Sequence, residues 1–420
     1  MQKEKIEHNI KRTKHFFKWL AFSVIIAVVV GFIGIAFDLS LEWANNFRTA
    51  NEWLIYLLPI GGLLIVGSYD LCKMLDDKGT NFVLVSVRSS EKITFKTAPL
   101  IFISTVITHL LGGSSGREGA ALQLGGSIAD KLARILKLDE KDKRIFTMCG
   151  MAAAFSAVFG TPVAAAVFSM EVISVGVMYY AAIVPCIVSA ALSSLLVSYF
   201  NVHTLACELT GIPKLNFTNI IRVICLGILI AGLSWIFCFV LRNVAKLFKQ
   251  YIKNPYLRVL IGGILIILLT KIIGTYDYNG VGSNVLTKAL SGGEIKPEAF
   301  LLKMIFTAIT IGSGFKGGEI VPTFFTGATF GGTVGKLLGL NSSFAAGLGM
   351  IGLFCGVTNC PMTSLIISIE LFGSKGIIYF ALISAFGYML SGYTGLYSEQ
   401  KILYSKFRPV FIDKKVNEKT

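Results

Sequence analysis

The chain has few charged residues: lysine, arginine, aspartate and glutamate make up 15% of its 420 residues. Soluble domains carry about 25%. Because 54% of the residues are hydrophobic, the shortage of charge excludes a soluble globule and predicts a protein with many membrane-spanning segments. The 43 glycines and ten prolines suit short, broken helices that pack closely against one another.

Clusters of catalytic or metal-binding residues are also missing. The four histidines are scattered, and the chain has no His-Glu-x-x-His helix, no nucleophile elbow and no phosphate loop. An intramembrane enzyme or receptor is therefore the least favoured hypothesis, and we expect no cofactor and no metal. The eight cysteines are too widely spread for a metal site, so we expect reduced, buried thiols.

Acidic residues are fewer than basic ones, 24 against 39, which gives a net charge of +15. Much of the basic excess precedes the first apolar run or follows the last, so it does not indicate a nucleic-acid partner. By the positive-inside rule, it predicts that the tails at 1–15 and 401–420 are both cytoplasmic and that the number of complete crossings is even. The first apolar run, 19–37, has no cleavage-site pattern and is expected to be a retained helix.

Several apolar stretches, such as 98–111 and 299–312, are too short for a simple membrane crossing, which takes about 20 residues. Another, 145–175, is long but is interrupted by glycine and proline. Short or interrupted hydrophobic segments indicate discontinuous helices and a binding site near the middle of the membrane.

The chain contains an internal repeat. A glycine, a proline twelve residues later and a glutamate nine residues after that recur in both halves: Gly150, Pro162 and Glu171, then Gly349, Pro361 and Glu370. Upstream, each half has a glycine-rich turn with an acid, Glu118 or Glu319, followed by a Gly-Gly pair at 125–126 or 331–332. We expect two membrane repeats, 16–205 and 206–400, in either parallel or inverted relation. Glu171 and Glu370 fit two roles, caps or ion-pair partners at the membrane edge, or a proton relay.

The turn at 112–119 carries Arg117 and Glu118 between two apolar segments. An acid at membrane depth is energetically costly and marks a candidate functional site. The apolar flanks argue against a solvent-facing loop with a surface ion pair. Because a helix start preceded by glycines exposes N–H groups that attract anions, we interpret this turn as an anion site with Glu118 as its gate.

A second glycine-rich turn ends at Glu319 and is followed by Pro322, a residue suited to the first turn of a helix. This pattern predicts a second helix start, whose amides at Ile320 and Val321 face the same anion. The alternative is a re-entrant turn with structural glycines only. Tyr397 can donate its hydroxyl to an anion, although tyrosine is also common at membrane interfaces.

At these residues the chain resembles the CLC family of chloride channels and proton-coupled anion antiporters, over about 15–400. Residues 116–119 match the family's GREGP turn, with Ala120 in place of the proline, and 317–322 match its GGxFxP turn. The resemblance implies an all-α polytopic membrane protein, an inverted repeat of short, tilted and broken helices. It also implies a homodimer with one pore in each subunit.

The resemblance further implies that anions sit where helix N-termini converge. Glu118 would alternately occupy the anion seat and carry a proton. The anion-binding residues carried over from the family pattern are Gly79, Thr80, Asn81, Phe82, Arg117, Gly119, Glu319, Ile320, Val321 and Tyr397.

Three departures from the family pattern bear on which anion is transported. The family's GSGIP turn should fall near 79–82, where no serine is present. Glu319 stands where most members have an apolar residue, and Val172 stands where the chloride antiporters have an inner proton-transfer glutamate. These changes resemble the fluoride-exporting branch, which often has threonine at the position of Val321.

Fluoride is small, strongly hydrated and a strong hydrogen-bond acceptor, so a site that removes its water must supply strong donors. Thr80, Asn81 and Tyr397 are candidate donors, and a protonated Glu319 is another. We therefore expect a halide/proton antiporter of the cell membrane that carries fluoride or chloride, with fluoride favoured. A passive chloride channel is the alternative, because the missing inner glutamate is compatible with it.

Overall fold

The computed structural model describes residues 2–77, 79–89, 93–200 and 207–418. In the first half, the helices are α1 (Gln2–Ala50), α2 (Leu58–Leu71), α3 (Thr80–Ser89), α4 (Thr97–Leu110), α5 (Glu118–Ile135), α6 (Glu140–Phe159), α7 (Pro162–Glu171) and α8 (Ile183–Tyr199), with short 3-10 helices η1 (Glu52–Leu57) and η2 (Tyr180–Ala182). In the second half they are α9 (Phe217–Tyr251), α10 (Pro255–Ile273), α11 (Ser283–Leu290), α12 (Ala299–Ser313), α13 (Ile320–Leu337), α14 (Ser342–Thr358), α15 (Pro361–Phe372) and α16 (Ile377–Leu390). The expected boundary between the repeats, at 205 and 206, lies outside the described residues.

Five helical stretches within the described residues are long and apolar enough to cross a membrane: Lys3–Ala50, Glu52–Leu71, Tyr180–Tyr199, Phe217–Tyr251 and Pro255–Ile273. Six shorter apolar helices accompany them, among them α4, α7, α12 and α15. This mixture confirms a multi-pass helical membrane protein with short and broken helices.

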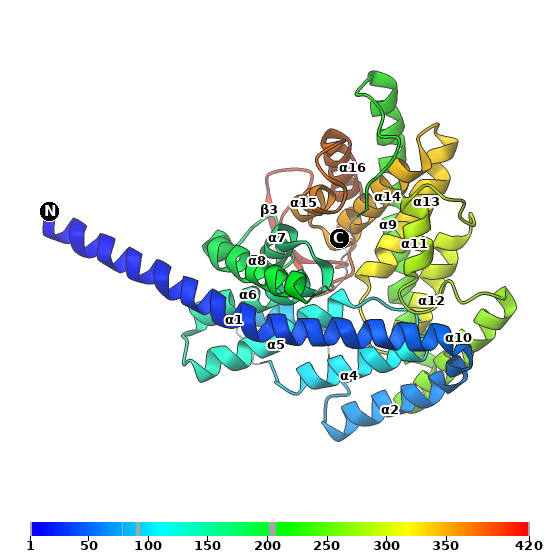
Figure 1. Ribbon diagram of the computed structural model, residues 1–420, viewed down its shortest axis with the longest axis horizontal. Helices are drawn as coiled ribbons and strands as arrows, with labels where there is room; N and C mark the ends of the chain where they lie inside the picture. Colours follow the sequence, from blue (N-terminus) through cyan, green and yellow to red (C-terminus); the bar gives the residue numbers. More distant parts are fainter. Residues whose placement is uncertain (1, 78, 90–92, 201–206, 419–420) are drawn as a thin grey trace.

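Helix α1 departs from the expected short helices, because it contains 49 residues. At 1.5 Å per residue it is about 73 Å long, more than twice the roughly 30 Å of a hydrocarbon core. Its first part projects from the body of the molecule (Figure 1), and residues 3–18 are exposed. The residues expected as a separate N-terminal tail are thus, from Gln2 onward, the beginning of this helix.

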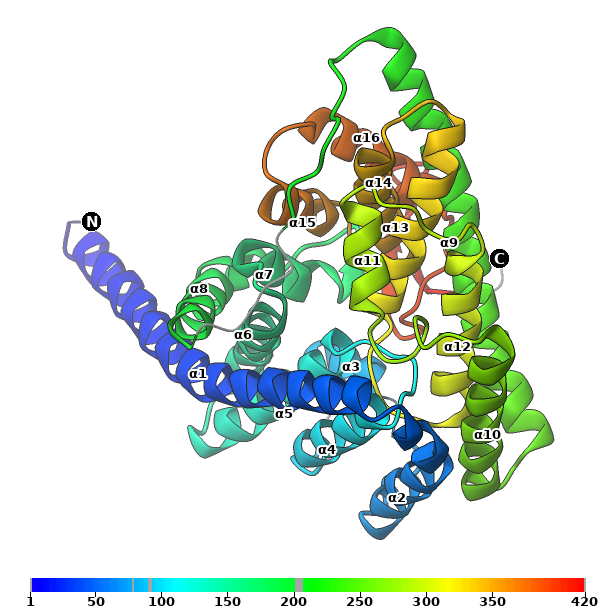
Figure 2. The same cartoon turned by 45° about the vertical axis from the view of Figure 1, so that its right-hand side comes forward.

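The two halves are built alike and gather on different sides of the molecule (Figure 2). In each half, two long helices cross at glycines: α5 crosses α6, and α13 crosses α14. A Cβ atom on Gly125 would lie 2.2 Å from the carbonyl oxygen of Gly150, and one on Gly327 would lie 2.4 Å from that of Gly349. The structural counterpart of Gly125 is therefore Gly327, and the expected match between the Gly-Gly pairs 125–126 and 331–332 is wrong.

Helices α7 and α15 cap each other. The Glu171 carboxylate, at the end of α7, accepts the N–H groups of Met362 (3.0 Å) and Thr363 (2.9 Å) at the start of α15. The Glu370 carboxylate, at the end of α15, accepts those of Val163 (2.9 Å) and Ala164 (2.8 Å) at the start of α7. Because each helix ends where the other begins, the two are antiparallel, as inverted repeats require. Of the two roles left open for these glutamates, the hydrogen bonds show that of helix caps.

A small three-stranded sheet accompanies the helices of this predominantly helical membrane protein. Strand β1 (Ser174–Val175) pairs in parallel with β2 (Lys401–Tyr404), which pairs antiparallel with β3 (Phe411–Lys415). Val175, Ile402 and Val416 form a buried apolar cluster beneath the sheet. The segment expected as a C-terminal tail is thus folded back onto the membrane helices, because its alternating apolar side chains have a surface to cover.

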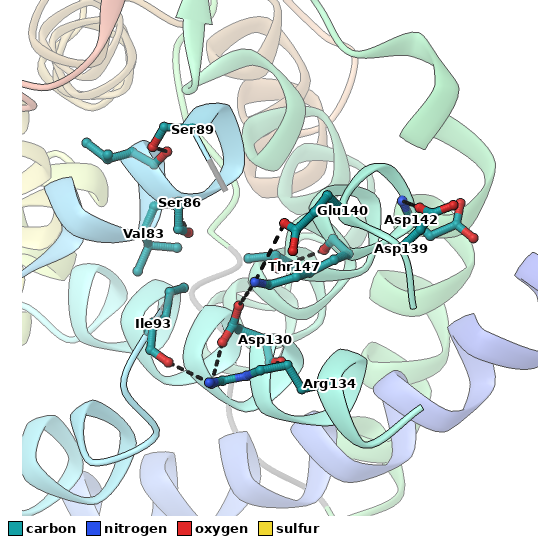
Figure 3. Close-up of polar contacts among 12 residues, drawn as sticks. Val83, Ser86, Ser89, Ile93, Asp130, Arg134, Asp139, Glu140, Asp142 and Thr147 are labelled. Carbon is teal, nitrogen blue, oxygen red and sulfur yellow. Dashed lines mark hydrogen bonds and ion pairs between the residues drawn. The ribbon is translucent and has the colours of Figure 1, made fainter. Parts of the chain in front are cut away.

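A charge cluster around the buried Asp130 holds the far end of α5 against α6 (Figure 3). Asp130 lies 2.5 Å from Arg134 and 3.1 Å from Lys143, and Arg134 also donates to the carbonyl oxygen of Ile93 at 2.7 Å. About 18 Å of helix separates Asp130 from Glu118 at the start of α5. The cluster therefore anchors the helix pair and takes no part in the site at the helix start.

The eight cysteines are free, and five of them are buried. Cys149 and Cys186 have their sulfur atoms 3.9 Å apart between α6 and α8, without a disulfide. Cys225 is exposed on α9, so the expectation that the thiols are buried fails at this position.

Candidate anion site

The first glycine-rich turn connects α4 to α5 and is buried. The Ser114 N–H donates to Thr310 Oγ1 of α12 at 3.0 Å, and the Ser114 and Thr307 hydroxyl oxygens are 3.1 Å apart. Gly112 has a φ of +89°, in the left-handed region that favours glycine. The turn is a hydrogen-bonded segment inside the protein, and the alternative of a solvent-facing loop is wrong.

The turns of the two halves bind each other directly. The N–H of Gly116 donates to the carbonyl oxygen of Gly318 at 2.6 Å, and the N–H of Gly318 donates to that of Gly116 at 2.6 Å. Only glycine allows this approach, because a Cβ atom on Gly318 would lie 2.7 Å from the Gly119 nitrogen. The starts of α5 and α13 are therefore held together, one from each half.

Glu118 is the first residue of α5 and is fully buried. Its Oε2 accepts the backbone N–H of Arg117 at 3.1 Å, whereas its Oε1 has no hydrogen-bond partner within the described residues. The point where a Cβ atom of Gly116 would stand lies 2.9 Å from this Oε2 and 3.1 Å from the Val321 nitrogen, in the first turn of α13. The carboxylate thus lies near the place where the two helix starts meet, and N–H groups at a helix start stabilise an anion.

Arg117 lies between two carboxylates. Its guanidinium forms an ion pair with Asp38 of α1 and lies 3.8 Å from Glu118 Oε1. Asp38 is buried, so the pair fixes α1 against the turn.

The second turn places its acid one position earlier than the first. Glu319 precedes the first residue of α13 and accepts the N–H of Thr323 at 3.1 Å through its carbonyl oxygen. Since α5 begins at Glu118 and α13 begins at Ile320, the counterpart of Glu118 is Ile320, and that of Glu319 is Arg117. The expected match between the two glutamates is wrong by one residue.

A cavity of about 480 Å³ reaches the two turns and brings together six of the predicted residues: Gly79, Thr80, Asn81, Gly119, Glu319 and Tyr397. The Thr80 hydroxyl donates to the carbonyl oxygen of Gly119 at 3.2 Å, and Asn81 Oδ1 accepts the backbone N–H of Glu399 at 3.1 Å. The cavity is thus bounded by both halves and by the segment that carries Tyr397.

Five predicted residues do not line this cavity: Phe82, Arg117, Glu118, Ile320 and Val321. Three of them, Glu118, Ile320 and Val321, are buried, whereas the neighbouring Gly119 and Glu319 line the cavity. Phe82 packs against the hydrophobic core. The seat of the Glu118 carboxylate is therefore separate from the open cavity.

Sequence reasoning missed several residues of the site. Gln123, one turn after Gly119, donates to the Thr80 hydroxyl at 3.2 Å and to the Gly119 carbonyl oxygen at 3.3 Å. Gln400 donates to the carbonyl oxygen of Val172 at 2.9 Å and so ties the Tyr397 segment to the end of α7. The available signal was the spacing of Gln123 from Gly119, because residues four apart lie on the same face of a helix. A single glutamine at that spacing is weak evidence for a site.

Comparison with known proteins identifies the family. The model of the voltage gated chloride channel family matches residues 75–392. A "Chloride/fluoride channel protein" of Pseudomonas syringae pv. tomato is 33% identical over 396 residues, which span 93% of this chain and 87% of that protein. The "H(+)/Cl(-) exchange transporter ClcA" of Yersinia pestis is 22% identical over 410 residues, 91% of this chain and 86% of that protein.

A solved structure described as a CLC-type fluoride/proton antiporter has the same fold, with a TM-score of 0.89 and 29% identity over 92% of this chain and 98% of that one. The family model covers most of the chain, and its match includes both turns and the helices that follow them. The chain therefore belongs to the CLC family of voltage gated chloride channels.

Proposed function

We propose that this protein is a halide transporter of the cell membrane that exchanges fluoride or chloride for protons, with Glu118 as its gate. The observation that carries the proposal is the pair of hydrogen bonds between Gly116 and Gly318, which joins two helix starts around a buried carboxylate. The relatives support this chemistry, because they are named a chloride/fluoride channel protein, an H(+)/Cl(-) exchange transporter and a fluoride/proton antiporter.

In this mechanism Glu118 acts as an anion tethered to the protein. While it is ionised, its carboxylate occupies the N–H groups at the helix starts and excludes a halide. Protonation removes its charge, so the carboxyl group leaves and a halide takes its place. Return of the carboxylate expels the halide and releases the proton, which couples the two fluxes.

The polar residues of the cavity suit a small halide. Thr80, Asn81 and Tyr397 can return hydrogen bonds to an anion that has lost water, and Glu319 can donate when it is protonated. Fluoride gains most from such donors because it is the smallest halide and the strongest acceptor. Glu319 and the absence of a serine at 79–82 favour fluoride over chloride.

The alternative function is a passive chloride channel. Val172 is the observation that favours it, because an apolar, buried side chain stands where the chloride antiporters carry their inner glutamate. A channel would let anions pass without moving protons uphill.

We further propose that the protein works in the lipid bilayer as a homodimer with one pore in each subunit, built from membrane repeats at 16–205 and 206–400. The basic ends of the chain support a cytoplasmic location of both termini. The exposed apolar residues of α8, such as Ile183, Val184, Ile187 and Leu195, are compatible with contact to lipid or to a second copy.

Flux from proteoliposomes tests the function. Liposomes with the purified protein are loaded with sodium fluoride or sodium chloride, and halide release is recorded together with external pH. We expect an outward halide gradient to drive proton uptake, with fluoride released faster than chloride. Halide release without proton movement would favour the channel.

Glu118→Gln tests the gate in the same assay. We expect it to lower proton movement by about a hundredfold or more, because the amide cannot carry a proton. Glu294→Gln is the control, because Glu294 lies on an exposed loop outside the cavity and the substitution is the same. Unchanged coupling in Glu118→Gln would refute the gating role.

A further inference from the structure

The charged side chains that line the cavity at the anion site are mainly basic. Within the described residues these are Arg242, Lys246, Lys249, Arg258 and Lys316, whereas the acids are Asp77 and Glu319. The first three project from one face of α9, since they are four and three residues apart. A cavity lined with excess positive charge concentrates anions and repels cations.

Lys316 differs from the other basic residues because it lies next to the anion site. It is three residues before Glu319 on the same turn, and its ammonium nitrogen lies 4.2 Å from the centre of the Tyr69 ring. Its other neighbour is Asp77, whose Oδ2 is 3.8 Å away. That separation is longer than a hydrogen bond, so the ion pair is loose.

Two polar atoms beside Lys316 lack a hydrogen bond. Asp77 Oδ2 and the Tyr69 hydroxyl make no hydrogen bond to any described residue, although Tyr69 is 2% exposed and the Asp77 side chain 3%. All three residues line the cavity. A buried polar group without a partner is destabilising by about 1 to 3 kcal/mol, so these groups indicate a binding position for a small polar species.

The chemistry of the position selects an anion. An ammonium group and a phenol hydroxyl are both donors, and the surrounding basic residues add to the attraction. Asp77 lies in the connection between α2 and α3, outside any helix, so its side chain can move away without breaking a helical hydrogen bond. Its carboxylate stands in for an anion, as Glu118 does at the helix starts.

We propose that Lys316 and the Tyr69 hydroxyl form a second halide site, which receives the anion from the cavity mouth, and that Asp77 occupies this site until the halide displaces it. The site rests on the proposed transport function. The cation–π contact with Tyr69 holds the ammonium group in place while it exchanges one anion for the other.

Halide flux at varied concentration tests the site in proteoliposomes, with sodium fluoride, or with sodium chloride if chloride is the faster ion. Lys316→Met is expected to raise KM about tenfold, because one charge-assisted hydrogen bond is lost. Asp77→Asn is expected to lower KM severalfold, because the competing carboxylate is gone. Tyr69→Phe keeps the ring and removes the hydroxyl, and it is expected to raise KM about threefold. In each variant the number of protons exchanged per halide stays unchanged.

Lys296→Met is the matched control, since Lys296 is exposed and lies outside the cavity. In the double variant Lys316→Met with Asp77→Asn, the gain from Asp77→Asn is expected to vanish, because Asp77 competes only for Lys316. An unchanged KM in both Lys316→Met and Lys316→Arg would overturn the proposal, and so would a gain from Asp77→Asn that persists without Lys316.

Calorimetric titration of the detergent-solubilised protein with sodium fluoride and sodium chloride separates this inference from the proposed function. If the wild type transports neither ion, the transport proposal fails, and the second site is judged by binding alone. Loss of binding in Lys316→Met with binding kept in Lys296→Met supports the site. Equal binding by the wild type and Lys316→Met refutes it.

Discussion

The two glycine-rich turns each carry a basic residue that is paired with an aspartate from another segment, but the pairs differ. Arg117 contacts Asp38, which belongs to the long helix α1, in a close ion pair. Lys316 is 3.8 Å from Asp77, which lies in a connection between helices. The first pair joins the turn to a long helix, whereas the second joins the turn to a connection between two helices.

The difference indicates that related turns have taken different roles. In the first turn the acid next to the arginine, Glu118, is buried at the helix start, and the ion pair holds the turn in place. In the second turn the acid, Glu319, faces the cavity together with Lys316. The first half thus supplies the gate that we propose, and the second half supplies the approach to it.

The largest loss of stability is expected from substitutions at the helix crossings, where the two halves are most alike. Gly125→Ala and Gly327→Ala each place a methyl group against a backbone carbonyl that cannot move aside. We expect each to destabilise the protein by about 3 kcal/mol, measured as a lower thermal-unfolding midpoint in detergent. Gly232→Ala in α9 is the control, because nothing lies within 4 Å of its added Cβ. A large loss in only one half would show that the two crossings are not equivalent.

A somewhat smaller loss of stability is expected when the aspartate of the close ion pair is replaced, and none when that of the loose pair is. Asp38→Asn leaves the Arg117 guanidinium without its charged partner, and we expect a loss of about 2 to 3 kcal/mol, since Arg117 is partly exposed. Asp77→Asn breaks only a loose pair, so its unfolding midpoint should stay within error of the wild type. Equal losses of stability in both variants would contradict the contrast between a close ion pair and a loose one.

The smallest measurable losses of stability are expected from removal of the reciprocal helix caps. Glu171 accepts three hydrogen bonds, including one from the Thr363 hydroxyl at 2.6 Å, whereas Glu370 accepts two and is less buried. We expect about 2 kcal/mol of lost stability for Glu171→Ala and about 1 kcal/mol for Glu370→Ala. Thr363→Val removes the extra hydroxyl. In that background, the losses of stability caused by Glu171→Ala and Glu370→Ala should be more nearly equal. The reverse order of the two losses would be inconsistent with capping as their main role.

The repeat could be predicted from the sequence because the spacing of Gly150, Pro162 and Glu171 recurs in the second half. The same residues proved to be a crossing, a helix start and a cap. The alignment of the two turns could not be predicted, because each turn has a glutamate after its glycines and the sequence suggests that the two correspond. In the structure Glu118 is the first residue of its helix, whereas Glu319 precedes its helix. Hydrogen bonds between Gly116 and Gly318 set the register instead.

Parts of the site escaped prediction for a related reason. Gln123, Lys316 and Asp77 have no motif of their own, and they acquire a role only because the cavity brings α3, α5 and α13 together. The C-terminal strands were read as a tail because the stretches are short, and their apolar positions make sense only against Val175.

The sequence alone determined that the protein lies in a membrane, that it has two related halves and that Glu118 stands at a helix start, because hydropathy and local backbone preferences are properties of nearby residues. The tertiary structure decided which helix starts meet, which carboxylates cap a helix and which face the cavity. These outcomes depend on hydrogen bonds and packing between residues about 200 positions apart, as between Gly116 and Gly318 or Glu171 and Thr363.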